Sequence, residues 1–293
     1  MRTVIENLIA SLDDIETEVD AFLRGYSNIW KWNQDGGGVV VISSRPYAWE
    51  DLDVEGRQTQ SRLMKNWDHW SHLLRAVLRG SPKETLENVE IATDLIRECL
   101  DQSEATYFET VGEARRGVQE QIHALRHALE PLQVGGTNHP PILAVDTNAL
   151  LFTPDLENWQ FDDISEFELV LLPSVLAELD RLKIEHRNEG VRGKAEALIG
   201  RIKGYRARGV LTGGVPLRKG RSTIRAVAVE VGLEMPLPWL DRANSDDRIL
   251  GSAVELMREH PNRGIALVTR DINLQNKAEF ARVPFLEPPR LTQ

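Results

Sequence analysis

The sequence predicts an α/β fold in its C-terminal half, with a parallel sheet flanked by helices, preceded by a mostly α-helical N-terminal domain. Up to Leu129, apolar residues recur every three or four positions, which is the periodicity of amphipathic helices. The stretch 133–141 (QVGGTNHPP) carries the residues of a linker. After it, short apolar runs alternate with helical patterns, as in parallel sheets. We therefore expect a domain over 1–134, a linker over 135–141 and a second domain over 142–293.

Apolar residues at helical spacing predict four helices in the N-terminal domain, over residues 4–22, 57–78, 81–100 and 111–129. Ser81-Pro82 is a start signal, with Ser81 expected as the N-cap and Pro82 at the first helical position. The glycines at 36–38 interrupt the helical pattern, and a short β-like run follows at 39–42.

In the C-terminal domain, short apolar runs predict strands over residues 142–146, 168–172, 222–229, 265–269 and 283–285. Helical patterns lie between them, over residues 173–183, 189–206, 246–259 and 274–281. Strands that alternate with helices in this way usually form a parallel sheet with helices on its faces.

Four acidic residues recur at corresponding points of this alternation. Asp146 ends the first strand, and Asp271 follows the strand 265–269. Glu178 lies in the helix after the second strand, and Asp246 opens the helix before 265–269. Because ligands of open α/β sheets bind beyond the carboxyl ends of the strands, we expect these acids to meet at that edge.

Clustered carboxylates repel one another unless a cation neutralises them, and Mg²⁺ and Mn²⁺ prefer oxygen ligands. A bound divalent metal activates water and stabilises charge on phosphoryl oxygens, so the expected chemistry is phosphodiester hydrolysis. A single aspartate at a strand end or helix start is common without any chemistry, and only the joint pattern argues for a site. Asp247 is ambiguous, since it is either a further ligand or a first-turn acid favoured by the helix dipole.

Four segments, in this order, resemble the PIN domain family of nucleases: AVDTNALL at 144–151, LPSVLAELDRLK at 172–183, NSDDRILGSAVEL at 244–256 and LVTRDINLQNKA at 267–278. The larger PIN domains found beside PhoH-type ATPases and in RNA-decay factors are the most similar variety. The resemblance covers about half of the chain, and residues 1–134 carry no family resemblance that we recognise.

The resemblance implies a PIN-like sheet and a Mg²⁺- or Mn²⁺-dependent endoribonuclease, usually acting on single-stranded RNA and leaving a 5′-phosphate and a 3′-hydroxyl. It implies that Asp146, Glu178, Asp246 and Asp271 form the ligand set, and that Asn148 orients the first aspartate. Further polar motif positions with less defined roles are occupied by Thr147, Ser245, Thr269 and Asn273.

The formal net charge is −10, but residues 181–225 carry 13 basic and three acidic side chains. Such a basic strip fits contact with a phosphate backbone, and RNA is favoured over DNA. The alternative is a solvated helix face, or a surface paired with the acidic N-terminal domain. The basic residues that we expect to contact nucleic acid are Arg187, Arg192, Lys194, Arg218, Lys219 and Arg221.

No apolar stretch approaches the roughly 18 residues of a membrane span, and acids occupy the region where a signal peptide would be apolar. We therefore expect a cytoplasmic protein with no membrane partner, whose N-terminal domain recruits a protein partner or self-associates. Two alternatives to a working ribonuclease stay open: a catalytically silent PIN scaffold that binds RNA or protein, and a conditional toxin that uses the same chemistry.

Overall fold

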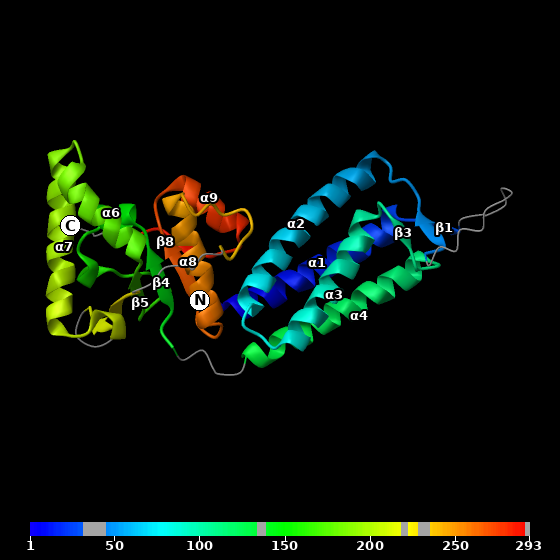
Figure 1. Cartoon of the computed structure of the whole chain (residues 1–293), viewed down its shortest axis with the longest axis horizontal. Helices are drawn as coiled ribbons and strands as arrows, with labels where there is room; N and C mark the ends of the chain where they lie inside the picture. Colours follow the sequence, from blue (N-terminus) through cyan, green and yellow to red (C-terminus); the bar gives the residue numbers. More distant parts are fainter. Residues whose placement is uncertain (32–44, 134–138, 218–221, 228–234, 291–293) are drawn as a thin grey trace. The chain divides into compact units, whose positions relative to one another are not determined.

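The computed structural model describes residues 1–31, 45–133, 139–217, 222–227 and 235–290. The chain forms two compact units, one made of Ile5–Val134 and the other of Met1–Val4 with Gly135–Gln293 (Figure 1). The first unit is mainly helical, and the second contains a parallel sheet between helices, so the predicted fold class is confirmed. Among the described residues, no helix combines the length and the apolar character needed to cross a membrane.

Four long helices build the N-terminal unit and lie lengthwise beside one another in Figure 1: α1 (Val4–Tyr26), α2 (Val54–Leu78), α3 (Lys83–Asp101) and α4 (Val111–Leu129). Their apolar stripes form the core of this unit, as the periodicity predicts. Trp67 and Trp70 are buried and stacked, with ring centroids 5.2 Å apart. The indole N–H of Trp70 donates to the carbonyl of Leu8 at 2.9 Å, which joins α2 to α1.

Two local features of this unit differ from the prediction. Ser81 does not cap α3; its N–H donates to the Leu78 carbonyl at 2.7 Å and so closes a turn after α2, while Pro82 is the N-cap residue. The β-like run predicted at 39–42 lies outside the described residues. A small antiparallel sheet that was not predicted contains β1 (Ile29–Lys31), β2 (Tyr47–Trp49) and β3 (Ala105–Thr106), strands too short for a sequence pattern.

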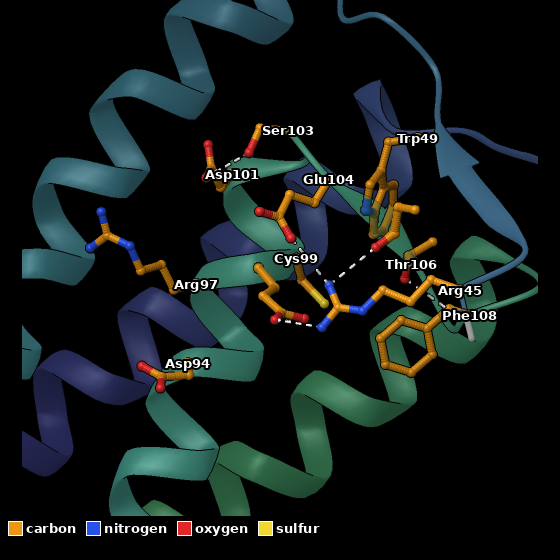
Figure 2. A pocket seen from close by; sticks show the side chains of 12 residues that line it. Arg45, Trp49, Asp94, Arg97, Cys99, Asp101, Ser103, Glu104, Thr106 and Phe108 are labelled. Atoms are coloured by element: carbon orange, nitrogen blue, oxygen red, sulfur yellow. Dashed lines mark hydrogen bonds and ion pairs between the residues drawn. The ribbon is translucent and has the colours of Figure 1, made fainter. Parts of the chain in front are cut away.

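Arg45 joins this small sheet to α3 beside a cavity of about 260 Å³, shown in Figure 2. Its guanidinium donates to the Ala105 carbonyl at 3.2 Å and to the Glu98 carboxylate at 3.0 Å. It also lies 3.5 Å from the Glu104 carboxylate and 4.5 Å from the ring centroid of Tyr107. The carboxylates of Glu98 and Glu104 therefore offset the charge of Arg45. Through these contacts, Arg45 joins the small sheet to α3 at the cavity.

In the described part of the C-terminal unit, six strands form one sheet. Their spatial order is β6 (Val215–Pro216), β7 (Thr223–Ala226), β5 (Glu168–Leu171), β4 (Ile142–Val145), β8 (Ile265–Val268) and β9 (Phe285–Leu286). Of these strands, β6 runs antiparallel to its neighbour and the others pair in parallel. The inner strands β5, β4 and β8 are almost fully buried, as expected for parallel strands covered on both faces.

The register of β4 against β8 aligns Val145 with Val268, so both strands end at the same level. The chain then enters a helix after each of the three inner strands. The helices of this unit are α5 (Thr147–Phe152), α6 (Pro173–Glu185), α7 (Glu189–Arg208), α8 (Ser245–Glu259) and α9 (Ile272–Phe280). The six-residue helix α5 was not predicted, and it determines where the residues after Asp146 lie.

Candidate active site

Asp146 lies where β4 passes into α5, and its side chain is buried at 4% exposure. One carboxylate oxygen accepts a hydrogen bond from the Ala149 N–H at 2.6 Å, and the other accepts one from the Thr269 hydroxyl. Burial raises the pKa of Asp146 to about 6. The two hydrogen bonds oppose this shift, whereas the charges of Asp271 and Glu178 add to it.

Asp271 follows β8 and caps α9. Its Oδ1 accepts hydrogen bonds from the N–H groups of Asn273 at 2.8 Å and Leu274 at 3.1 Å. Its own N–H donates to the hydroxyl oxygen of Thr269 at 3.0 Å. Thr269 is fully buried and therefore links the carboxylate of Asp146 to the backbone of Asp271 across adjacent strands.

Glu178 reaches the same edge from α6, the helix that follows β5. Its Oε2 accepts a hydrogen bond from the Thr147 hydroxyl at 2.7 Å, and its Oε1 lies 4.0 Å from the guanidinium of Arg181. Because Thr147 directly follows Asp146, this bond holds the α6 carboxylate next to the end of β4.

Asp246 is half-buried in the first turn of α8. Burial is the main cause that raises its pKa, and the charges of Asp271, Asp247 and Glu178 raise it further, while Lys277 lowers it. Asp246 therefore lies within electrostatic reach of two of the other predicted acids. Asp146 and Asp246 thus each interact electrostatically with Asp271 and Glu178, which is consistent with the four predicted carboxylates lying near the same edge of the sheet.

Asp247 has a different environment from Asp246. It is buried, and its Oδ1 lies 2.6 Å from the ammonium nitrogen of Lys277. Its Oδ2 accepts a hydrogen bond from the Asp241 N–H at 2.8 Å. Both oxygens thus have protein partners, which favours a structural role for Asp247 over that of a further ligand.

The remaining polar motif positions differ in whether their side chains contact the predicted acids. Asn148 is exposed, and the hydrogen bonds that the structure describes on Asp146 come from Ala149 and Thr269. Ser245 is exposed in the first turn of α8, and Asn273 acts through its backbone N–H.

Sequence reasoning missed Asn244 and Lys277. Asn244 caps α8 by accepting from the N–H groups of Asp246 at 2.9 Å and Asp247 at 3.3 Å. Its position just before the helix is a recognisable N-cap signal. No comparable signal marks Lys277, because its partner Asp247 is 30 residues away and the pair depends on how α8 and α9 pack.

The predicted basic strip is only partly available for a ligand. Arg187 and Lys194 are exposed, but the guanidinium of Arg192 donates to the His186 carbonyl at 2.7 Å, at the end of α6. Arg225, from the same segment, forms an ion pair with Glu168 within the sheet. Three predicted contact residues lie outside the described residues: Arg218, Lys219 and Arg221.

No group of three or more His, Cys, Asp or Glu side chains within the described ranges is arranged to hold a metal ion. The donor set nevertheless fits a divalent cation, because four carboxylates supply hard oxygen ligands, and the charges of Asp271 and Glu178 add to the effect of burial on the pKa values of Asp146 and Asp246. Mg²⁺ usually keeps several waters and needs only one or two protein carboxylates together with substrate phosphates. Asp146, Glu178, Asp246 and Asp271 would hold such a hydrated ion partly through water.

Replacing Thr269 by valine should raise the pKa of Asp146 further, because it removes a hydrogen bond that lowers it. We expect metal affinity or cleavage to fall about 10- to 100-fold, which is typical for residues that orient ligands. The rising limb of the pH–rate profile should also move to higher pH. Thr269→Ser keeps the hydroxyl and should retain most activity. Ser252→Ala is the control for loss of a buried hydroxyl, because the hydroxyl of Ser252 is hydrogen-bonded within α8. An unshifted profile in Thr269→Val would show that the hydroxyl does not orient Asp146.

The comparisons with known proteins agree with the geometry of this unit. A search of curated proteins finds no match. The family model for the PIN domain matches residues 143–287, a span that runs from β4 to just beyond β9 and includes all four acids. This match confirms the resemblance stated from the four sequence segments. The C-terminal half of the chain therefore belongs to the PIN domain family, whose members are generally metal-dependent nucleases.

Proposed function

We propose that this chain is a Mg²⁺- or Mn²⁺-dependent ribonuclease that hydrolyses phosphodiester bonds of single-stranded RNA. The observation that supports the proposal is that acids from different segments lie near one edge of the sheet, where Thr269 bridges Asp146 and the backbone of Asp271, and Thr147 binds Glu178. Burial raises the pKa values of Asp146 and Asp246, and the charges of Asp271 and Glu178 add to it. Ionised acids held together without a cation destabilise a fold. A divalent ion, bound with a substrate phosphate, is the partner that offsets this charge.

When bound, Mg²⁺ or Mn²⁺ supplies a water of lowered pKa and offsets charge on a phosphoryl oxygen. The chain's own residues prepare the ligands for it. Thr269 fixes one oxygen of Asp146, and Thr147 fixes one oxygen of Glu178. Asp246 lies in the first turn of α8 and Asp271 is the N-cap of α9, so both lie at helix N-termini, whose dipoles favour negative charge.

The basic residues supply the contact with the strand. Arg187 is exposed between α6 and α7, Lys194 is exposed within α7, and α6 also carries Glu178. Positive side chains at these positions attract the phosphate backbone on either side of the cleaved bond. RNA is the favoured substrate because the resemblance of the four motifs is to nucleases that act on RNA.

The test is a cleavage assay on single-stranded RNA and single-stranded DNA with the full-length, metal-stripped protein, to which Mg²⁺, Mn²⁺ or EDTA is added. We expect metal-dependent RNA cleavage that falls at least about 100-fold in Asp271→Asn. Asp180→Asn is the matched control, because Asp180 is an exposed carboxylate on the same helix as Glu178 and pairs with Lys183 at 3.8 Å.

Each outcome distinguishes the proposal from an alternative. Cleavage that persists in EDTA would exclude a metal-dependent reaction. A metal-replete protein that binds RNA but cleaves neither RNA nor DNA would instead identify a PIN scaffold. Growth arrest on expression, relieved by Asp271→Asn, would show that the same chemistry serves a conditional toxin.

A further inference from the structure

An exposed aromatic ring and an arginine lie against each other in the two segments that carry Asp146 and Asp271. Phe152 is the last residue of α5 and is 41% exposed. The guanidinium carbon of Arg270 lies 3.7 Å from the centroid of the Phe152 ring. Arg270 is itself exposed, so this stacked pair is accessible to a ligand.

Both residues are connected to the carboxylates by short stretches of backbone. Arg270 directly precedes Asp271. Phe152 ends the six-residue helix that Asp146 caps, and a rise of 1.5 Å per residue gives an axial separation of about 9 Å. The pair is therefore tied to the segments that carry Asp146 and Asp271, within reach of a strand whose phosphate is bound by these acids.

The environment of Arg270 differs from that of the other arginines that stack on tyrosine or phenylalanine. Arg208 stacks on Tyr205, but that ring is buried at 1% exposure and Arg208 also pairs with Glu157 at 2.8 Å. Arg270 forms no ion pair with any carboxylate of the described residues, although acids lie nearby. Its charge is thus not offset by an ion pair within the described residues, and its exposed side chain is accessible to an incoming group.

We propose that Phe152 and Arg270 form a stacking platform for an unpaired nucleobase next to the cleaved phosphate. This inference rests on the proposed nuclease function and specifies the substrate as a strand with unstacked bases. Bases in single-stranded nucleic acid stack on aromatic rings and on arginine guanidinium planes, and every base offers such a face. The platform would therefore favour single strands without selecting a base sequence, whereas bases in a duplex are already stacked on one another.

The test measures binding separately from cleavage. Fluorescence anisotropy with the full-length protein in EDTA and in Ca²⁺ would compare single-stranded RNA, single-stranded DNA, duplexes and single strands made of abasic sites. We expect Phe152→Leu and Arg270→Gln each to weaken binding of intact single strands about 10-fold, the lower part of the range for stacking one base. Binding of abasic strands should change little in Phe152→Leu, and Phe152→Tyr should restore binding of intact strands.

The controls are an aromatic ring of similar exposure and a partly exposed arginine, both away from the acids. Phe280→Leu alters a ring that is 37% exposed at the far end of α9, and Arg258→Gln removes a cation in the last turn of α8. Neither change should alter single-strand affinity. In cleavage assays, Phe152→Leu should raise KM more than it lowers kcat, because the ring positions the strand and takes no part in bond breaking.

The outcomes separate this platform from the proposed function. Equal affinity in Phe152→Leu, Arg270→Gln and the two controls would overturn the platform, even where metal-dependent cleavage is found. Base-dependent binding without any cleavage would support the platform and contradict the nuclease. Arg270→Gln keeps the test decisive if Phe152→Leu folds poorly, since Arg270 is an exposed side chain outside the core.

Discussion

Asp146→Asn is expected to abolish cleavage and, in the absence of metal, to make the protein more stable at neutral pH. Burial raises the pKa of Asp146 from an ordinary 3.8 to about 6, so ionisation at neutral pH opposes folding. At 1.36 kcal/mol per pKa unit, the cost is about 3 kcal/mol. Asparagine removes the charge but hydrogen-bonds less well to Ala149 and Thr269, so a net gain of about 1–2 kcal/mol is expected.

The same shift determines how stability depends on pH. The native state holds the proton of Asp146 up to about pH 6, whereas the unfolded chain loses it near pH 4. The stability of the metal-free protein should therefore fall as the pH rises from about 4 to about 6, and should be free of this cost below pH 4. The raised pKa of Asp246 acts in the same direction. Asp146→Asn should flatten this dependence.

Urea unfolding in EDTA between pH 4 and 8 measures both effects, and an Mg²⁺ titration at pH 7.5 measures the linkage to metal. Mg²⁺ should raise the unfolding free energy of the unmodified protein more than it raises that of the Asp146→Asn variant, because only a native state that binds the ion is stabilised by it. Asp180→Asn serves as the isosteric control. A clear loss of metal-free stability in Asp146→Asn would identify Asp146 as a structural cap of α5.

The places of the four acids in the fold could be predicted from the sequence because local signals determine them. Asp146 and Asp271 follow short buried strands, and Asp246 stands in the first turn of a helix that begins with an Asn-Ser-Asp segment. Parallel strands end at a common edge, so residues far apart in the sequence meet there. The sheet order, which places β4 between β5 and β8, then brings Glu178 to the same edge.

Other contacts could not be predicted because they depend on packing between elements. The hydroxyl of Thr269 joins Asp146 to Asp271 only because β4 and β8 are in register. Arg225 belongs to a strongly basic segment, yet it faces Glu168 on a neighbouring strand. A charge pattern in the sequence cannot show which basic residues are already paired.

The pair of Lys277 and Asp247 carries the second large effect that we expect. It joins α9 to α8 at 2.6 Å, and the side chains are 30% and 7% exposed. Lys277→Met would leave the carboxylate of Asp247 buried without its counter-charge. Removing one partner of a buried ion pair costs 3–5 kcal/mol, and the partial exposure of Lys277 lowers the expected loss of unfolding free energy to about 2–4 kcal/mol.

A double-mutant cycle in urea separates this pairing from a loss of packing. Lys277→Met combined with Asp247→Asn should recover much of the stability that Lys277→Met alone loses, because no buried charge remains. Lys277→Met should also raise the pKa of Asp246, which Lys277 lowers, and so move the rising limb of the pH–rate profile upward. Equal losses in the single and double variants would mean that Lys277 stabilises the fold by packing alone. The pH–rate profile tests the charge of Lys277 separately, because its effect on the pKa of Asp246 is lost in Lys277→Met however Lys277 stabilises the fold.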